Sequence, residues 1–176
     1  MPVFLELGDL RVVHACWDPE NINAIPDGLR FTREFLIKLH YPENIKIFNA
    51  IDECLKGREH KLPDGMKFLD GEGNERTHVR IRWYLDSRNI NYEDYYLENI
   101  PELIGKKVET DTKTNKDYYY KEDELPVFFG HYWFKGNPKI ESNNVACVDY
   151  SVAKGGRLVA YKWNGERELR NEGFVC

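Results

Sequence analysis

The segment that most constrains the fold of this 176-residue chain is residues 126–134, PVFFGHYWF. Its apolar run ends at Gly130 and His131 follows, which predicts a fully buried strand that stops at a glycine. A glycine there lets the chain turn sharply or lets a ligand approach the backbone. A histidine at the end of a rigid strand suits a metal ligand or a catalytic base, and it equally suits a core histidine bonded to a backbone carbonyl.

The start of the chain repeats this arrangement. Residues 3–15 contain two apolar runs around a Gly-Asp turn, so they predict a β-hairpin. The second run, LRVVHA, ends in His14. Two histidines at the exits of two apolar strands can converge at one edge of a sheet and share a metal ion. We therefore expect the rings of His14 and His131 to lie within metal-bridging reach of each other.

Helical spacing of apolar residues appears twice after the hairpin. It predicts helices over residues 33–40 and 43–56, the first capped by Thr32 and the second ended by Gly57. Asp18, followed by proline, predicts the start of a shorter helix before them. These helices are expected to pack outside the sheet.

Residues 57–123 read as an insertion-like region with a hairpin and a polar loop. The hairpin covers 67–84, and its second arm alternates strictly between polar and apolar residues. The charged stretch 106–123 has no clear period and predicts a surface loop. His40 and His60 lie among charged or loop residues and are predicted to be solvated.

A strand pair is predicted after the polar link 135–144. The apolar run at 144–151 and its partner at 157–163 are joined by a Gly-Gly turn, which predicts an antiparallel meander. Together with the opening hairpin and the strand before His131, this meander should form a mixed sheet. The predicted fold class is therefore α/β, a mixed sheet with flanking helices, in one domain over 1–176.

Composition excludes several classes of function. The formal net charge is −5, without the basic face that a nucleic-acid-binding protein needs. No apolar run approaches the ~18–20 residues of a membrane span, and the N-terminus has no signal-peptide pattern. The four cysteines are far apart and form no CxxC pair, so the sequence predicts a reduced, cytoplasmic protein with neither a disulfide framework nor a zinc knuckle.

A resemblance to a known family rests on three segments taken in order: VVHACWD at 12–18, VFFGHYWF at 127–134 and NVACVDYSVAKGGRLVAYKW at 144–163. They resemble the C-terminal half of calcineurin-like metallophosphoesterases, in the branch near symmetrical bis(nucleosyl)tetraphosphatases and serine/threonine protein phosphatases. The resemblance spans residues 5–163. The segment at 55–84 looks like an insertion found in some bacterial members.

The resemblance implies the C-terminal half of a four-layer α-β-β-α sandwich. It matches His14 and His131 to two histidine ligands of a dinuclear centre of Mn, Zn or Fe ions. It matches Asp149 to the aspartate of the final hairpin, in a structural role or beside a ligand. Trp133 stands where many members have a further histidine, which agrees with the single-histidine branch. The implied reaction is hydrolysis of a phosphoester or phosphoanhydride by a hydroxide that two metal ions activate.

The family's N-terminal motifs, DxH, GDxxDR and GNHE, do not occur in the chain. Those motifs supply the remaining ligands and the general acid. By this resemblance the chain is one incomplete domain. Its expected partners are a phosphorylated substrate and the missing N-terminal half, in cis or in trans. We expect little activity from the chain alone, because two histidines bind such ions weakly.

Two other functions stay open on the sequence. The chain could be a non-catalytic binding or interaction module that uses an exposed sheet edge. It could also be a mononuclear metal enzyme that combines His14 and His131 with a carboxylate such as Asp18 or Asp149. No spacing in the sequence singles out that third ligand.

Overall fold

The computed structural model describes residues 2–109 and 118–176. The chain divides into two compact units. The first, here called the sheet unit, combines the residues up to 57 with Lys121–Cys176, and the second, the insert unit, is Arg58–Tyr120. The insert unit falls within the region 57–123 that the sequence marks as insertion-like. Part of the predicted polar loop, residues 110–117, lies outside the described residues.

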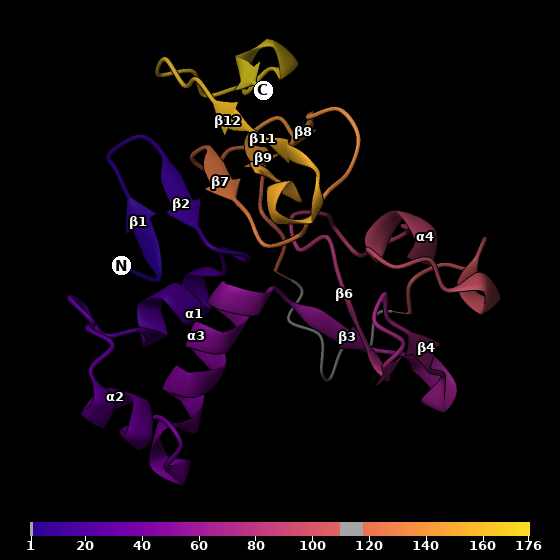
Figure 1. The fold of residues 1–176 in the computed structure, drawn as a ribbon, viewed down its shortest axis with the longest axis horizontal. Helices are drawn as coiled ribbons and strands as arrows, with labels where there is room; N and C mark the ends of the chain where they lie inside the picture. Colours follow the sequence, from indigo (N-terminus) through magenta and orange to yellow (C-terminus); the bar gives the residue numbers. More distant parts are fainter. Residues whose placement is uncertain (1, 110–117) are drawn as a thin grey trace. The chain divides into compact units, whose positions relative to one another are not determined.

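The sheet unit is built on a five-stranded mixed sheet in the order β1-β2-β7-β9-β8 (Figure 1). Strands β1 and β2 pair antiparallel, β2 runs parallel to β7, β7 runs parallel to β9, and β8 pairs antiparallel with β9. The strands are β1 (Phe4–Glu6), β2 (Arg11–Val13), β7 (Val127–Phe129), β8 (Ile140–Ser142) and β9 (Val145–Cys147).

The two central strands are buried along their whole length. Every residue of β7 (VFF) and of β9 (VAC) is buried, as expected for parallel strands covered on both faces. Because β2, β7 and β9 are parallel, their carboxyl ends lie at the same edge of the sheet. We call this edge, with the residues that directly follow the three strands, the carboxyl edge. Ligands of open α/β sheets bind at such edges.

The sequence predicted much of this sheet, but not all of it. The hairpin, the buried strand before His131 and the mixed character of the sheet are confirmed. The meander prediction is wrong in part, because the chain leaves the sheet after β9. Instead, β10 (Asp149–Tyr150) pairs with β11 (Arg157–Leu158), and β12 (Ala160–Tyr161) pairs with β13 (Phe174–Val175), in two separate ribbons.

The physical reason is that β7 and β8 occupy both sides of β9, so the next strand pairs with β10 outside the sheet. Ser151 has a φ of 61°, in the left-handed region, so the extended strand cannot continue through it. The predicted polar link also contains a strand. Its residues Ile140–Ser142 form β8, which takes the edge position beside β9 that the meander was expected to fill.

Two of the predicted helices begin where the sequence places them, and α3 begins two residues later than the expected residue 43. Asp18 caps α1 (Pro19–Ala24) by accepting the N–H of Glu20 at 2.7 Å, and Thr32 caps α2 (Arg33–Lys38) by accepting the N–H of Phe35 at 3.2 Å. A 3₁₀ turn, Pro42–Asn44, leads into α3 (Ile45–Lys56). These helices lie outside the sheet, as predicted, and α1 packs against α3. The buried residues of α3 are Ala50, Ile51 and Cys54.

The insert unit consists of two small ribbons and a short helix. Strand β3 (Glu59–Lys61) pairs with β6 (His78–Arg80), β4 (Phe68–Leu69) pairs with β5 (Glu75–Arg76), and α4 spans Tyr92–Tyr95. The predicted alternation is confirmed, since Val79, Ile81 and Trp83 are buried while the residues between them are not. Tyr120 also packs inside, with its ring centroid 5.7 Å from that of Trp83.

His60 is not the solvated residue that the sequence predicted. Its ring packs on Tyr95 and Tyr96, with centroid distances of 5.3 and 6.1 Å. Burial, together with the neighbouring Arg58 guanidinium, lowers the pKa of His60 from 6.5 to about 4. No local pattern around His60 indicates this packing, because the partner tyrosines lie more than thirty positions further along the chain.

Among the residues that the structure describes, none of the helices is both long and apolar enough to span a membrane.

The lowered pKa of His60 predicts that acid destabilises the insert unit. Above pH 6.5 the ring is neutral whether the unit is folded or unfolded. Between pH 6.5 and about 4 only the unfolded chain takes up the proton, so the free energy of unfolding falls as the pH drops. The expected loss is at most about 3 kcal/mol, at 1.36 kcal/mol per pKa unit.

The amide of Ile81 reports this change, because it donates to the Arg58 carbonyl at 3.0 Å inside the unit. Its protection factor against hydrogen exchange should fall between pH 7 and pH 5. The fall should disappear in His60→Phe, which keeps a packed ring without a proton site, and should persist in His78→Phe, on the exposed side of β6. A pH dependence that survives in His60→Phe would assign the effect to another group.

Candidate functional site

Two histidines meet at the carboxyl edge. His14 directly follows β2, and His131 lies two residues after the end of β7. Their ring centroids are 5.1 Å apart, and the ring planes are tilted by 50°. His14 is exposed and His131 is partly exposed, so both rings reach solvent. The juxtaposition that the two strand ends predicted is therefore confirmed, whereas metal binding by the pair stays a prediction.

The backbone of His131 forms an unusually tight turn. Gly130 donates its N–H to the His14 carbonyl at 2.9 Å, which continues the β2–β7 pairing by one residue. Tyr132 then donates its N–H to the Gly130 carbonyl at 2.8 Å, across His131, whose φ is 67°. A three-residue turn with a positive central φ is a γ-turn of the rarer, strained kind. This turn sets the direction in which the His131 ring leaves the sheet.

Gly130 lies where three segments come together. A Cβ atom built on it would lie 3.5 Å from the Cβ of Asp149 and 3.6 Å from the carbonyl oxygen of His14. Asp149, the third residue that the sequence singled out, therefore borders the histidine pair. Its Oδ1 accepts the N–H of Ser151 at 3.0 Å, and its backbone carbonyl accepts the N–H of Phe134 at 3.0 Å. These bonds give Asp149 the role of bracing the loops around His131.

The end of α3 supports both histidines. The Cys54 carbonyl accepts the N–H groups of Ala15 at 2.9 Å and Cys16 at 3.4 Å, which fixes the chain directly after His14. Gly57 ends the helix with φ 87° and ψ 166°, a conformation that is essentially restricted to glycine. The buried Tyr132 ring lies against it, so that a Cβ on Gly57 would come within 2.7 Å of Tyr132 Oη.

Two other residues of metal-binding type, Asp18 and Cys147, are not available as ligands. Asp18, offered by the sequence as a third ligand, is only 1% exposed and caps α1. Cys147, at the end of β9, is buried, and burial raises the pKa of its thiol to about 12. At neutral pH it is therefore a thiol, whereas metal binding needs the thiolate. Of the two carboxylates that the sequence offered as a third ligand, Asp149, beside Gly130, is therefore the one that does not cap a helix.

The donor set fits part of a metal centre. Imidazole nitrogens suit Zn, Mn and Fe, but such sites normally use three or four protein ligands. Within residues 2–109 and 118–176, no group of three or more His, Cys, Asp or Glu side chains is placed to hold a metal ion. The described part of the chain thus offers a pair of ligands and not a full set.

Trp133 is the feature of the site that the sequence analysis did not use. It was noted only as the residue that replaces a histidine. In the structure its φ is 50°, it is 49% exposed, and its ring centroid lies 6.3 Å from that of His131. The ammonium of Lys154 lies 3.8 Å from the centre of its ring. No apolar pattern in the sequence signals this exposure, because it follows from the positive φ of Trp133.

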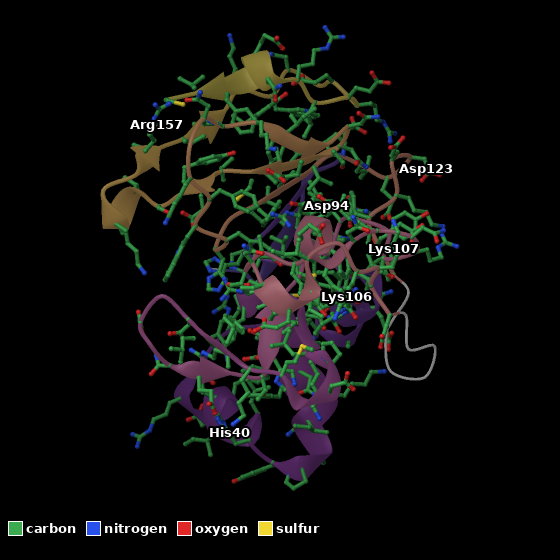
Figure 2. The ribbon with its side chains drawn as sticks, turned by 90° about the vertical axis from the view of Figure 1, so that its right-hand side faces the viewer. His40, Asp94, Lys106, Lys107, Asp123 and Arg157 are labelled. Carbon is green, nitrogen blue, oxygen red and sulfur yellow. The ribbon has the colours of Figure 1, made fainter. Side chains whose placement is uncertain are left out.

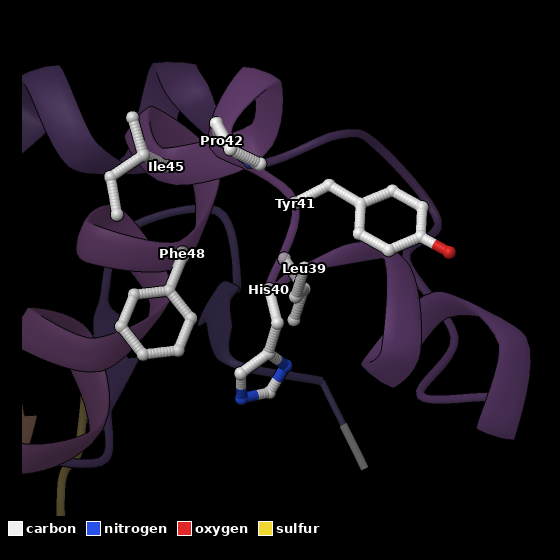
Figure 3. A pocket seen from close by; sticks show the side chains of 6 residues that line it. All are labelled: Leu39, His40, Tyr41, Pro42, Ile45 and Phe48. Carbon is white, nitrogen blue, oxygen red and sulfur yellow. The ribbon is translucent and has the colours of Figure 1, made fainter.

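Apart from the carboxyl edge, the sheet unit has a hollow among its helices. It has a volume of about 420 Å³ and is lined by Leu39, His40, Tyr41, Pro42, Ile45 and Phe48 (Figure 3). His40 is exposed, as predicted, and its Nδ1 lies 2.9 Å from the Leu36 carbonyl. Ile45, the first residue of α3, lines this hollow and is 56% exposed. His40 and Arg157 of β11 lie at opposite ends of the sheet unit in Figure 2.

Comparison with known proteins adds no identification: no family model, no curated protein and no solved structure matches this chain.

The contact between Gly57 and Tyr132 predicts the outcome of a substitution. Gly57→Ala adds a methyl group against a buried tyrosine and also forces alanine into a glycine-only conformation. We expect the free energy of unfolding to fall by about 2–4 kcal/mol, from backbone strain plus steric overlap. The measurement is denaturant unfolding, combined with the NMR shift of the His131 ring, which the displaced Tyr132 should change.

Gly28→Ala is the matched control. Gly28 also has a positive φ, 65°, but a Cβ there meets nothing within 4 Å. It should cost only about 1–2 kcal/mol, the penalty of the left-handed conformation alone. If both variants lose the same free energy of unfolding and the His131 signal does not move, the end of α3 does not position His131.

Proposed function

We propose that this chain is the part of a metal-dependent phosphoesterase that contributes His14 and His131 as metal ligands. The observation that carries the proposal is the pair of rings, 5.1 Å apart, at the carboxyl ends of two parallel strands. The resemblance of the three segments to calcineurin-like metallophosphoesterases supports the same assignment. Under this proposal, the mixed sheet belongs to one half of an α-β-β-α sandwich.

A pair of divalent ions would supply Lewis-acid activation of a phosphate ester toward hydrolysis. The chain's own residues would do the positioning. Gly130 ties the two histidine segments together, because its N–H donates to the His14 carbonyl at 2.9 Å directly before His131. Asp149 braces the loops behind the pair through its bonds to Ser151 and Phe134.

The missing ligands define the second part of the proposal. Two imidazoles leave a metal centre incomplete, so the carboxylates that complete it come from outside the described residues. A polypeptide that carries the family's N-terminal motifs, in cis or in trans, is the proposed source. The chain alone should bind metal weakly and turn over a phosphate ester slowly or not at all.

Metal titration of the purified chain tests the histidine pair. Addition of Mn²⁺ to the ¹⁵N-labelled chain should broaden the ring signals of His14 and His131 before those of His40 and His78. Zn²⁺ should bind with an affinity that falls at least tenfold in His14→Ala and in His131→Ala, since each substitution halves a two-ligand site. His40→Ala and His78→Ala are the matched controls, because both remove an exposed histidine that is not part of the pair.

Two outcomes would contradict the proposal in different ways. If the His14→Ala and His131→Ala variants bind Zn²⁺ as the unaltered chain does, the pair is not a metal site. If the chain alone rapidly hydrolyses p-nitrophenyl phosphate with added metal and His14→Ala abolishes this, it contains a complete site of its own. That result would favour the mononuclear enzyme, with Asp149 as the remaining candidate carboxylate. Under the proposal, hydrolysis requires the N-terminal motifs in trans and is lost in His131→Ala.

A second candidate function is a non-catalytic interaction module. It is favoured by the apolar hollow of Figure 3 and by the exposed large apolar residues in the same helical part of the chain, which are Phe31, Leu36, Ile37, Tyr41 and Ile45. Exposed apolar patches of this kind mark interaction sites. Ile45→Lys should then weaken self-association or partner binding, as measured by analytical ultracentrifugation, and should leave metal binding unchanged. An unchanged sedimentation profile in that variant would remove the support for this candidate.

A further inference from the structure

We infer that Trp133 and Lys154 form a binding site for a phosphate ester whose leaving group carries a flat aromatic ring. The inference deepens the proposed function and rests on it, because it assigns the substrate class of the same carboxyl edge. Trp133 would stack on the aromatic ring, and Lys154 would neutralise charge on the phosphate. The phosphate would then lie on the His131 side of the indole.

The position of Trp133 follows from the turn that holds His131. The intervening residue, Tyr132, is buried, and its ring packs on Phe129 and Phe134 with centroid distances of 5.2 and 6.0 Å. With Tyr132 anchored inward, both neighbours leave the core. His131 and Trp133 have φ values of 67° and 50°, and their ring centroids are 6.3 Å apart.

The exposure of Trp133 is unusual within this chain. The chain has four tryptophans; Trp17 and Trp83 are almost fully buried, Trp163 is partly buried, and Trp133 is 49% exposed. An exposed indole in a left-handed conformation is costly for folding on two counts, the strain and the unburied apolar surface. Such strain concentrates at ligand-binding sites, where the conformation serves the ligand.

Lys154 supplies the charge. It ends the 3₁₀ turn Val152–Lys154, between Ser151 and Gly155, whose φ values of 61° and 81° curl the loop back over the Trp133 ring. Its ammonium, 3.8 Å from the ring centre, is held there by the electron-rich face of the indole. Contacts of this kind at exposed sites are weak, so a phosphate can draw the lysine away while an aromatic ring takes its place on the indole.

This arrangement selects a chemical class of ligand. An indole face stacks on flat π-systems whatever their substituents. An ammonium group acts as a point charge that attracts phosphate. The chemistry is shared by nucleoside monophosphates, which carry a purine or pyrimidine, and by phosphotyrosine, which carries a phenol ring. The ligand class is therefore an aromatic phosphate, and the source is decided by experiment.

The test compares two phosphates that differ only in aromaticity. Phenyl phosphate and cyclohexyl phosphate have the same charge and similar size, but only the first has a flat π-system. The full chain is titrated with each in EDTA, and binding is followed from the amide signals of Phe134 and Lys154. Phenyl phosphate should bind about tenfold more tightly, as expected for one stacking contact.

Three variants separate the two contacts. Trp133→Leu should abolish the preference for phenyl phosphate, and Trp133→Phe should retain part of it. Lys154→Gln should weaken both phosphates by a similar factor and leave their ratio unchanged. Equal affinity of the two phosphates for the unaltered chain, or a preference that survives in Trp133→Leu, would overturn the inference.

Two further pairs of ligands identify the source. Adenosine 5′-monophosphate is compared with ribose 5-phosphate, and phosphotyrosine with phosphoserine; the pair with the larger ratio identifies the preferred leaving group. Because EDTA removes divalent ions, these titrations do not depend on metal binding by His14 and His131. If the metal titration fails and the preference for phenyl phosphate is intact, the phosphoesterase proposal is rejected and the aromatic phosphate site is kept. If metal binds to the histidine pair but phenyl phosphate is not preferred, the aromatic phosphate site is rejected and the phosphoesterase proposal is kept.

Discussion

One helix end holds the candidate site together. The last carbonyl groups of a helix have no partners within the helix, and in α3 the Cys54 carbonyl accepts two N–H groups from the segment after His14. Three residues later, Gly57 gives the ring of Tyr132 room to pack, and Tyr132 is the neighbour of His131. The two histidines come from distant parts of the chain, yet both are positioned by the same turn of α3. Without this support, the chain that follows β2 and β7 would have no fixed direction beyond the last paired residues of these strands.

The same support explains how strained backbone persists at the carboxyl edge. Among the described residues, five other than glycine have a positive φ, and His131, Trp133 and Ser151 are three of them. Each such conformation costs on the order of 1–3 kcal/mol and persists only where the surroundings determine it. Here the surroundings are the hydrogen bond that the Tyr132 N–H donates to the Gly130 carbonyl and the buried Tyr132 ring. They also include the hydrogen bonds that Asp149 accepts from the N–H groups of Ser151 and Phe134. Within the described part of the sheet unit, all the non-glycine residues with a positive φ thus follow β7 or β9, which distinguishes this edge from the rest of the unit.

The features that the sequence predicted are those determined by neighbouring residues. Apolar runs ended by a histidine, the cap at Asp18 and the glycine at the end of α3 are short-range patterns, and each appears in the structure where it was expected. The features that were missed depend on contacts between distant segments. His60 is buried by tyrosines of a later helix, and β8 becomes a strand only because β9 offers an edge. Trp133 was overlooked because its exposure follows from a positive φ, which no apolar pattern encodes for a residue other than glycine.

The placement of the histidines and their number have opposite effects on metal binding. Because the end of α3, the turn at His131 and the pairing of β2 with β7 already fix both backbones, little conformational entropy remains to be lost when a ligand binds. Placement therefore favours binding. Number opposes it, because two imidazoles fill only half of a tetrahedral shell and water must occupy the remainder. A carboxylate brought to this edge would meet two histidines that need no reorganisation, so most of the interaction energy of each added ligand would appear as affinity. Under the proposed function, the edge is thus better suited to completing a shared centre than to holding an ion by itself.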